Sequence, residues 1–372
     1  MLTVFRAAAD PDSLVPDDGA LAVPADASSM CRLATGRSAL FHLISRLPAE
    51  NRDFVLLPAY VAEGVIEPFV RAGFAVLFYR LGPDLSPRTE DVAALLERTG
   101  GKAVFVLIHY FGFSARSADL SSVLSAGGAL VVEDFAHALF TTSPNGTPLA
   151  ADAAVSLFSL NKFLPLADGA LLFSRIKDID VSLEDSSLPE LPAETLQAYN
   201  RHLHTAHRLL ACGDPAAVKG LLAEIGDSYE CYYRHIRADL GPKRQSDEAR
   251  RIARLLPCGS LVHRRVVNSR LLYRDLNARL LRPLHPVLPE GVVPFCVPAL
   301  VPAGERGRII EHMLGRGVVL STLRDKWDFI PEKDATRFAV ERAFIEQHIL
   351  IPVNETISPD SMAHMVEQLN GM

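Results

Sequence analysis

The sequence predicts an α/β protein built on a mostly parallel central sheet with helices on both faces. Between residues 30 and 175, short apolar runs alternate with longer mixed segments. The runs are rich in Val, Leu and Phe and lack the polar alternation of a half-exposed sheet, which is typical of strands buried on both faces. Strand–helix–strand alternation of this kind favours parallel strands joined by helical crossovers.

Six strands are expected in this region, with three helical segments between them. The strands are expected at 54–58, 75–79, 103–108, 129–133, 154–158 and 169–173. The helices are expected at 61–72, 88–99 and 117–127. Ser86-Pro87 marks the start of the second helix, because proline is tolerated in the first turn of a helix and serine caps it.

The rest of the chain is expected to add a helical stretch and a smaller α/β domain. Apolar side chains recur at helical spacing after residue 185, and a Pro-rich stretch from residue 283 predicts an edge strand. A helix over 303–315, strands at 317–321 and 349–353, and a last helix from Ser358 complete the predicted elements. The expected domains are an N-terminal segment at 1–29, a large domain at 30–245 with a helical insertion at about 185–245, and a small C-terminal domain at 246–372.

Composition and charge argue against several classes of protein. The chain has 372 residues, of which 49% are hydrophobic and 22% charged, as in ordinary globular proteins. Its 38 cationic and 44 acidic residues give a net charge of −6, which is unsuited to binding a phosphate backbone. Five scattered cysteines with no CxxC pair favour reduced thiols over disulfides or a metal site. Without a signal peptide or a transmembrane segment, we expect a cytoplasmic protein that binds neither nucleic acid nor membrane.

The first candidate site is a glycine turn that precedes an apolar helix. Gly36, Arg37 and Ser38 follow Thr35 directly before this helix. The free backbone N–H groups of a helix start, together with the Ser38 hydroxyl, would form a cradle for a phosphate group. Taken alone, the same residues also suit a plain helix N-cap.

The other two candidates are an acid and a lysine that each follow a predicted strand. Asp134 ends an apolar strand, where a carboxylate can keep a pyridinium nitrogen protonated, although an isolated Asp is also a common helix cap or ion-pair partner. Lys162 lies between two apolar runs, where desolvation would lower the pKa of its amine and suit it to Schiff-base chemistry. A lone lysine can equally extend from a loop into solvent. Ligands gather at the carboxyl ends of parallel strands, which favours a single shared site.

The order of these three motifs resembles fold-type I enzymes that use pyridoxal 5'-phosphate (PLP). Lys162 follows Asp134 by 28 positions, and Ser159 precedes the lysine by three. More narrowly, the chain resembles the DegT/DnrJ/EryC1/StrS family of aminotransferases, known mostly for sugar amination in polysaccharide and antibiotic biosynthesis. The resemblance is close over 30–175 and loose over 260–372. The segments that carry it are TGRSAL, LLPAYVAEGVIEPFVRAGFAV, HYFG, EDFAHAL, SLNKFLPLADGA and ILIPVNETIS.

This resemblance implies three catalytic residues. Lys162 would form the internal aldimine with PLP and, once freed, move the proton between the substrate Cα and C4′. Asp134 would pair with the pyridinium N1. His137 stands where the family has Gln or His near the phenolic oxygen of the cofactor, or else is a satisfied polar residue on a helix face.

The resemblance also implies residues that bind the rest of the cofactor. The expected phosphate ligands are Gly36, Arg37, Ser38 and Ser159. An aromatic side chain should stack on the pyridine ring, and Tyr60 is the first choice with Phe111 as its competitor. Either aromatic residue equally suits the protein core.

The sequence departs from the family pattern on the substrate side. The turn after the lysine is Ala167-Asp168-Gly169-Ala170 in place of a GEGG-like turn. A family segment whose Asn reaches the phosphate of the neighbouring subunit is replaced by a longer helical stretch, in which Asn200 suits an ordinary helix surface. Trp327 either lines the substrate cleft, where the family often has an aromatic residue, or packs the second domain.

The function that the resemblance implies is a PLP-dependent aminotransferase. It would transfer an amino group from an amino-acid donor, glutamate by family analogy, to a keto-sugar or related carbonyl acceptor, and would act as a homodimer. Two alternatives stay open. The remodelled 185–245 segment allows a PLP enzyme of another type, such as a lyase, a dehydratase or a C–C bond-forming enzyme. A PLP-fold binding or regulatory protein with little turnover is also conceivable, but such a protein has no chemical need for both Lys162 and Asp134.

Overall fold

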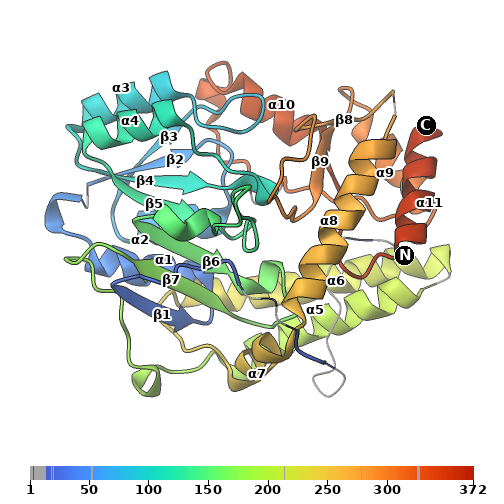
Figure 1. Cartoon of the computed structure of the whole chain (residues 1–372), viewed down its shortest axis with the longest axis horizontal. Helices are drawn as coiled ribbons and strands as arrows, with labels where there is room; N and C mark the ends of the chain where they lie inside the picture. Colours follow the sequence, from blue (N-terminus) through green and yellow to red (C-terminus); the bar gives the residue numbers. More distant parts are fainter. Residues whose placement is uncertain are drawn as a thin grey trace.

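A seven-stranded sheet forms the first half of the computed structural model (Figure 1), in the order β1-β7-β6-β5-β4-β2-β3. The structure describes residues 3, 14–17, 19, 21–51, 53–212, 214–277, 279–324 and 327–372. The strands are β1 (Ser29–Leu33), β2 (Phe54–Pro58), β3 (Ala75–Tyr79), β4 (Ala103–Ile108), β5 (Leu130–Asp134), β6 (Val155–Ser159) and β7 (Ala170–Ser174). Strands β2 to β6 pair in parallel, and β7 is antiparallel to both β6 and β1. The mostly parallel sheet is thereby confirmed.

The strand predictions succeed in the centre of the sheet and fail at one edge. The observed bounds of β2, β3 and β4 are those predicted, and β5, β6 and β7 are shifted by one residue. All six residues of β4 are buried, which explains its continuous apolar run. Strand β1 was not predicted, because its residues alternate between buried and exposed at the sheet edge and form no apolar run.

Four helices flank this sheet and join its strands. They are α1 (Gly36–Arg46), α2 (Glu63–Arg71), α3 (Thr89–Thr99) and α4 (Ala118–Gly127). Helix α1 packs against α2, and α3 packs against α4 (Figure 1). Helices α3 and α4 end at Gly100 and Gly128, whose positive φ angles of 61° and 67° give the left-handed cap that glycine adopts most easily.

The segment after the large sheet is helical, as the sequence predicts. It contains α5 (Ala193–Ala211), α6 (Pro215–Ala238), α7 (Asp247–Leu255) and α8 (Cys258–Asp275). Helices α5 and α6 pack along each other. Tyr199 and Tyr233 join an apolar cluster with Ala34 of the large sheet region, whereas Leu209 packs in a cluster with Val319. The α5–α6 pair therefore contacts both halves of the chain.

A second, three-stranded antiparallel sheet lies in the C-terminal part, in the order β10-β9-β8. Its elements are β8 (Arg282–Pro283), β9 (Val297–Leu300), α9 (Arg306–Leu314), α10 (Ala339–Gln347), β10 (His348–Ile351) and α11 (Pro359–Asn370). The edge strand predicted from the Pro-rich stretch is found only in part: β8 ends at Pro283 and lies at the edge, but β9, which contains Pro298, is the central strand of this sheet. The strand predicted at 317–321 is wrong, because in the described part of the chain this segment has only isolated bridge residues, Val318 and Ser321, of which Ser321 pairs with Leu350. Its apolar residues instead fill the core, where Val318 is buried.

The largest apolar cluster joins the two halves of the molecule. It contains Tyr60 from the end of β2 together with Trp327 and Phe344 from the C-terminal part. The C-terminal part therefore packs onto the large sheet next to the end of β2. None of the helices in the described part of the chain is long and apolar enough to cross a membrane.

Candidate active site

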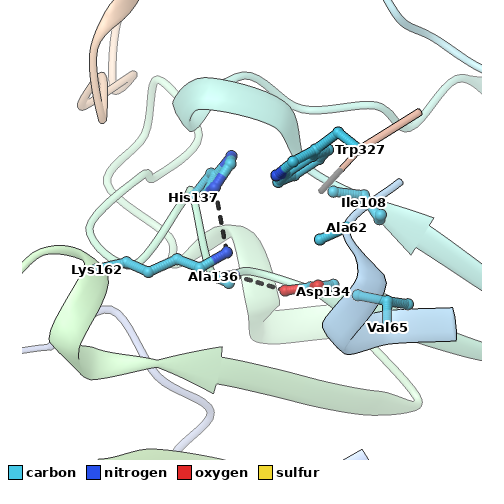
Figure 2. Close-up of a pocket in the computed structure, with 8 residues that line it drawn as sticks. All are labelled: Ala62, Val65, Ile108, Asp134, Ala136, His137, Lys162 and Trp327. Atoms are coloured by element: carbon cyan, nitrogen blue, oxygen red, sulfur yellow. Dashed lines mark hydrogen bonds between the residues drawn. The ribbon is translucent and has the colours of Figure 1, made fainter. Parts of the chain in front are cut away.

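Three predicted site residues meet at the carboxyl ends of neighbouring strands. Asp134 is the last residue of β5 and lies opposite Ile108, the last residue of β4. Strand β6 ends next to β5 and continues into a short 3₁₀ helix, Leu160–Lys162. Figure 2 shows the pocket at this edge, whose lining residues are Ala62, Val65, Ile108, Asp134, Ala136, His137, Lys162 and Trp327. The structure therefore brings Asp134, His137 and Lys162 together, as the sequence predicts.

The amine of Lys162 is enclosed although the residue as a whole is half-buried. Its Nζ lies 3.2 Å from His137 Nε2 and 5.9 Å from the centre of the Trp327 ring. Burial lowers the pKa of the amine, and the nearby Asp134 carboxylate partly opposes that shift. A lysine with a lowered pKa supplies more of the neutral amine that attacks a carbonyl carbon.

Asp134 is a buried acid that lies close enough to Lys162 to influence its charge. The backbone N–H of Ala136 donates to its Oδ1 at 2.8 Å. Burial raises the pKa of the carboxyl group, and the charge of Lys162 acts in the opposite direction. A buried carboxylate is stable only with a compensating cation, so the pocket favours a cationic group next to Asp134.

His137 is held between aromatic rings. Its imidazole is stacked on Phe295 at 4.8 Å with an interplanar angle of 4°, and on Phe111 at 5.5 Å with an angle of 29°. Burial lowers the pKa of the imidazole well below its usual value, so the ring is neutral. Its Nδ1 is buried without a hydrogen-bond partner within the described residues. The aromatic stacking therefore fixes the ring plane and leaves hydrogen-bonding capacity unused.

The residue before Asp134 belongs to a different network. Glu133 accepts hydrogen bonds from Arg116 at 2.7 and 2.8 Å, and its Oε2 lies 2.9 Å from His109 Nε2. Burial acts to raise the pKa of Glu133, but these two partners lower it overall. The two acids of the Glu133-Asp134 pair therefore have different surroundings: Glu133 has cationic and imidazole partners, whereas Asp134 lines the pocket.

The predicted phosphate cradle is partly assembled. A Cβ added at Gly36 would lie 3.8 Å from the Cβ of Ser159, so the start of α1 faces the end of β6. The backbone N–H groups of Gly36 and Arg37 precede the first intrahelical hydrogen bond. The Ser38 side chain instead completes the helix cap, since its hydroxyl donates to Thr35 O at 3.0 Å and Thr35 Oγ1 accepts from Ser38 N at 3.1 Å.

The Arg37 side chain points away from this cradle. It forms an ion pair with Glu67 of α2, and its guanidinium lies 4.6 Å above the ring of Tyr233 on α6. It therefore links three helices and does not line the pocket. Of the four predicted phosphate ligands, Gly36 and Ser159 face each other, and Arg37 is placed to contribute only its backbone.

The aromatic residue that lines the pocket is Trp327. Tyr60 is fully buried, its hydroxyl donates to Leu323 O at 3.1 Å, and its ring lies 4.8 Å from that of Trp327. Phe111 is also fully buried and contacts His137. Neither residue proposed for ring stacking lines the pocket. The sequence could not distinguish the two expected positions of Trp327, because this residue lies outside any helix or strand.

The α5–α6 pair reaches the turn that carries the lysine. The hydroxyl of Tyr199 donates to Asn161 O at 3.5 Å, and Asn161 Oδ1 accepts from Ser159 Oγ at 2.9 Å. Asn200, which weakly matches the family asparagine that reaches the neighbouring subunit, is a half-buried residue of the same helix. Tyr199 is thus the residue of this helical stretch that contacts the lysine turn, a contact that no local sequence pattern indicated.

Comparisons with known proteins find similar folds among solved structures and no match by sequence. No model of a protein family and no curated protein sequence matches the chain. Among solved structures, the aminotransferase TlmJ from Streptoalloteichus hindustanus is 18% identical with a TM-score of 0.66, covering 92% of this chain and 85% of its own. A DegT DnrJ EryC1 StrS aminotransferase from Brucella abortus is 15% identical with a TM-score of 0.63, covering 93% and 86%. A putative sugar aminotransferase from Streptococcus pneumoniae, solved in its PMP form, is 16% identical with a TM-score of 0.65, covering 92% and 87%.

These likenesses extend over 92 to 93% of this chain. At identities of 15 to 18% they establish the architecture, and the residues of the pocket must support the chemistry by themselves. The chain therefore has the fold shared by these aminotransferases, which confirms the fold class predicted from its sequence.

Proposed function

We propose that the protein is a PLP-dependent aminotransferase. It would take an amino group from an amino-acid donor, with glutamate the first to test, and deliver it to a keto-sugar or related carbonyl acceptor. The observation that carries the proposal is the shared pocket of Lys162 and Asp134, at the strand ends of a fold found in solved aminotransferases. By the same resemblance we expect a homodimer, which sedimentation of the purified protein tests.

The residues in and next to the pocket fit PLP in four respects. Lys162 offers an amine with a lowered pKa to the aldehyde, and Asp134 offers a buried acid to the ring nitrogen. His137 Nδ1 is buried without a hydrogen-bond partner among the described residues, while its Nε2 lies 3.2 Å from the lysine amine. Gly36 and Ser159 face each other at a helix start, which is a favourable place for the phosphate.

When bound, PLP supplies an electron sink that stabilises negative charge at the substrate Cα. The protein supplies orientation and proton control. Lys162 would hold the cofactor through Nζ and, when released, accept and return a proton at that atom. The negative charge of Asp134 would keep the facing nitrogen protonated, and His137 Nε2 would orient the lysine amine. Ala62, Val65 and Trp327 exclude water from the pocket, which strengthens each of these electrostatic effects.

An absorbance spectrum of the purified protein tests the cofactor assignment. We expect a visible band after incubation with PLP, its loss on reduction with borohydride, and no such band in Lys162→Ala. Adding glutamate should convert the bound cofactor to its pyridoxamine phosphate form. Absence of the band in the wild type would overturn the proposal, whereas a band without conversion by any amino acid would favour a PLP enzyme of another reaction type.

A further inference from the structure

The aromatic wall of the pocket comes from the C-terminal part of the chain. Trp327 is 7% exposed, and its ring lies 5.6 Å from that of His137 and 5.9 Å from Lys162 Nζ. In the view of Figure 2 the indole lies across the pocket from Asp134. A flat ring held between Lys162 and Asp134 would therefore lie next to the indole.

The segment that carries Trp327 is anchored on both sides of that residue. Before it, Leu323 N donates to His348 Nε2 at 2.8 Å, and Leu323 O accepts from the Tyr60 hydroxyl at 3.1 Å. After it, Asp328 forms a backbone bridge with Tyr60. Burial lowers the pKa of His348 to about 4, so its ring stays neutral and keeps an acceptor nitrogen for Leu323. These contacts set the position of the indole in advance.

Tyr60 is placed to support this wall and not to form it. Its ring is enclosed by Trp327 at 4.8 Å, Phe344 at 5.0 Å and Tyr110 at 5.6 Å, and its hydroxyl is already bonded to the segment that carries Trp327. Tyr60 therefore reaches the pocket only through the indole.

We infer that Trp327 is the residue that stacks on the pyridine ring of the cofactor, and that Tyr60 is a positioning residue behind it. The inference rests on the proposed function and adds a residue that the sequence left open. It also makes the binding of the ring depend on the second sheet, because His348 at the start of β10 helps to hold the segment that carries the indole.

Trp327 is the single tryptophan of the chain, so the tryptophan fluorescence of the full-length protein reports on this wall alone. Titration of the cofactor-free protein with PLP should quench this emission in proportion to the growth of the visible band. Trp327→Ala should raise the dissociation constant for PLP about 2- to 10-fold, and Trp327→Phe should restore most of the affinity because it keeps a ring.

Two further variants separate stacking from general packing. Phe338→Ala removes a buried ring of the C-terminal part that packs on Phe78, and it should lower stability without changing PLP affinity. Tyr60→Phe keeps the ring and removes the hydroxyl bond to Leu323. Without any cofactor, it should make the Trp327 emission more accessible to acrylamide.

The outcomes distinguish this inference from the proposed function. If the visible band forms while the emission stays constant and Trp327→Ala binds PLP as the wild type does, Trp327 does not stack on the ring and the inference is overturned. If the wild type forms no visible band, the proposed function fails and the inference fails with it.

Discussion

The two walls of the pocket are built in different ways. Asp134 and Lys162 lie on one wall, at the ends of neighbouring parallel strands whose register fixes where each chain segment ends. Trp327 lies on the other wall, and its segment is held by contacts such as the bond from Tyr60 to Leu323, which are 263 positions apart. The reactive groups are thus positioned by local strand topology, and the aromatic wall by long-range packing.

This difference predicts that the two walls respond differently to mutation. Changes at Asp134 and Lys162 should alter the chemistry and leave the fold stable, because the sheet is held by its backbone hydrogen bonds. Changes on the other wall should alter stability or cofactor affinity first. Four variants test this division, in order of decreasing expected effect.

Replacing Arg265 should cause the largest loss of stability, because this residue links the segment next to Lys162 to the C-terminal part of the chain. This fully buried residue of α8 donates to the carbonyls of Pro294 and Phe295 and pairs with Glu355 at 2.7 Å. Its guanidinium also lies 5.0 Å above Phe163, next to the lysine. Arg265→Met should lower the free energy of unfolding by about 3–5 kcal/mol, measured by urea denaturation. A loss below about 1 kcal/mol would contradict a structural role for this buried arginine.

Asp134 should have the largest effect on the reaction. Asp134→Asn removes the negative charge opposite the ring nitrogen, and we expect kcat for transamination to fall about 10²- to 10³-fold. Glu133→Gln is the matched control one position earlier, because Glu133 bonds His109 and Arg116 and does not line the pocket. It should lower stability and keep the visible band. Equal losses of activity in both variants would contradict separate roles for the two acids.

The contrast between the walls also explains what the sequence could predict. Buried parallel strands are continuous apolar runs, so β2 and β4 were predicted with their observed bounds. The bounds of β3 were also predicted, because this strand is an apolar run although it is mostly half-buried at the sheet edge. Because parallel strands end at the same edge, Asp134 and Lys162 could be placed together from their positions alone. Of the residues expected to bind a phosphate group, Gly36 and Ser159 face each other, whereas the Ser38 hydroxyl completes the helix cap.

The second wall could not be predicted because no local pattern encodes it. Trp327 lies in an irregular segment, and only the fold shows that Tyr60 and His348 bond to that segment. The run at 317–321 is as apolar as a strand but fills the core without forming one, and the one bridge to β10 among the described residues is at Ser321. Any buried segment is apolar, whether or not it forms a strand. The apolar run at 317–321 could therefore not distinguish a strand from an irregular segment of the core.

Asp168 should make stability depend on pH. It is fully buried, it accepts hydrogen bonds from Ser246 N and Oγ at 2.8 Å each, and burial raises its pKa to about 6. A raised carboxyl pKa stabilises the fold below about pH 4, and this stabilisation is lost as the pH rises through 6. Relative to the wild type, Asp168→Asn should therefore gain up to roughly 3 kcal/mol between pH 4 and pH 7.5. The free energy of unfolding is measured by urea denaturation at both pH values. The same difference between variant and wild type at pH 4 and pH 7.5 would contradict this prediction.

Gly36 should have the smallest effect, and it tests the phosphate cradle against a plain helix cap. In Gly36→Ala the added methyl group would point at Ser159 without a clash, so stability should change by less than about 1 kcal/mol. Affinity for PLP should fall roughly 5- to 10-fold, because the methyl group takes space that the phosphate needs. Affinity for pyridoxal, which lacks the phosphate, should not change. Equal losses of affinity for PLP and pyridoxal would indicate that Gly36 is only part of a helix cap and does not bind the phosphate.

The most direct test of the account is to locate the covalent attachment of the cofactor. The protein is incubated with PLP, reduced with borohydride and digested, and the peptides are identified by mass spectrometry. The account predicts that the reduced cofactor is found on the peptide that contains Lys162 and not on those that contain Lys102, Lys177 or Lys219. Attachment elsewhere, or no attachment at all, would contradict it.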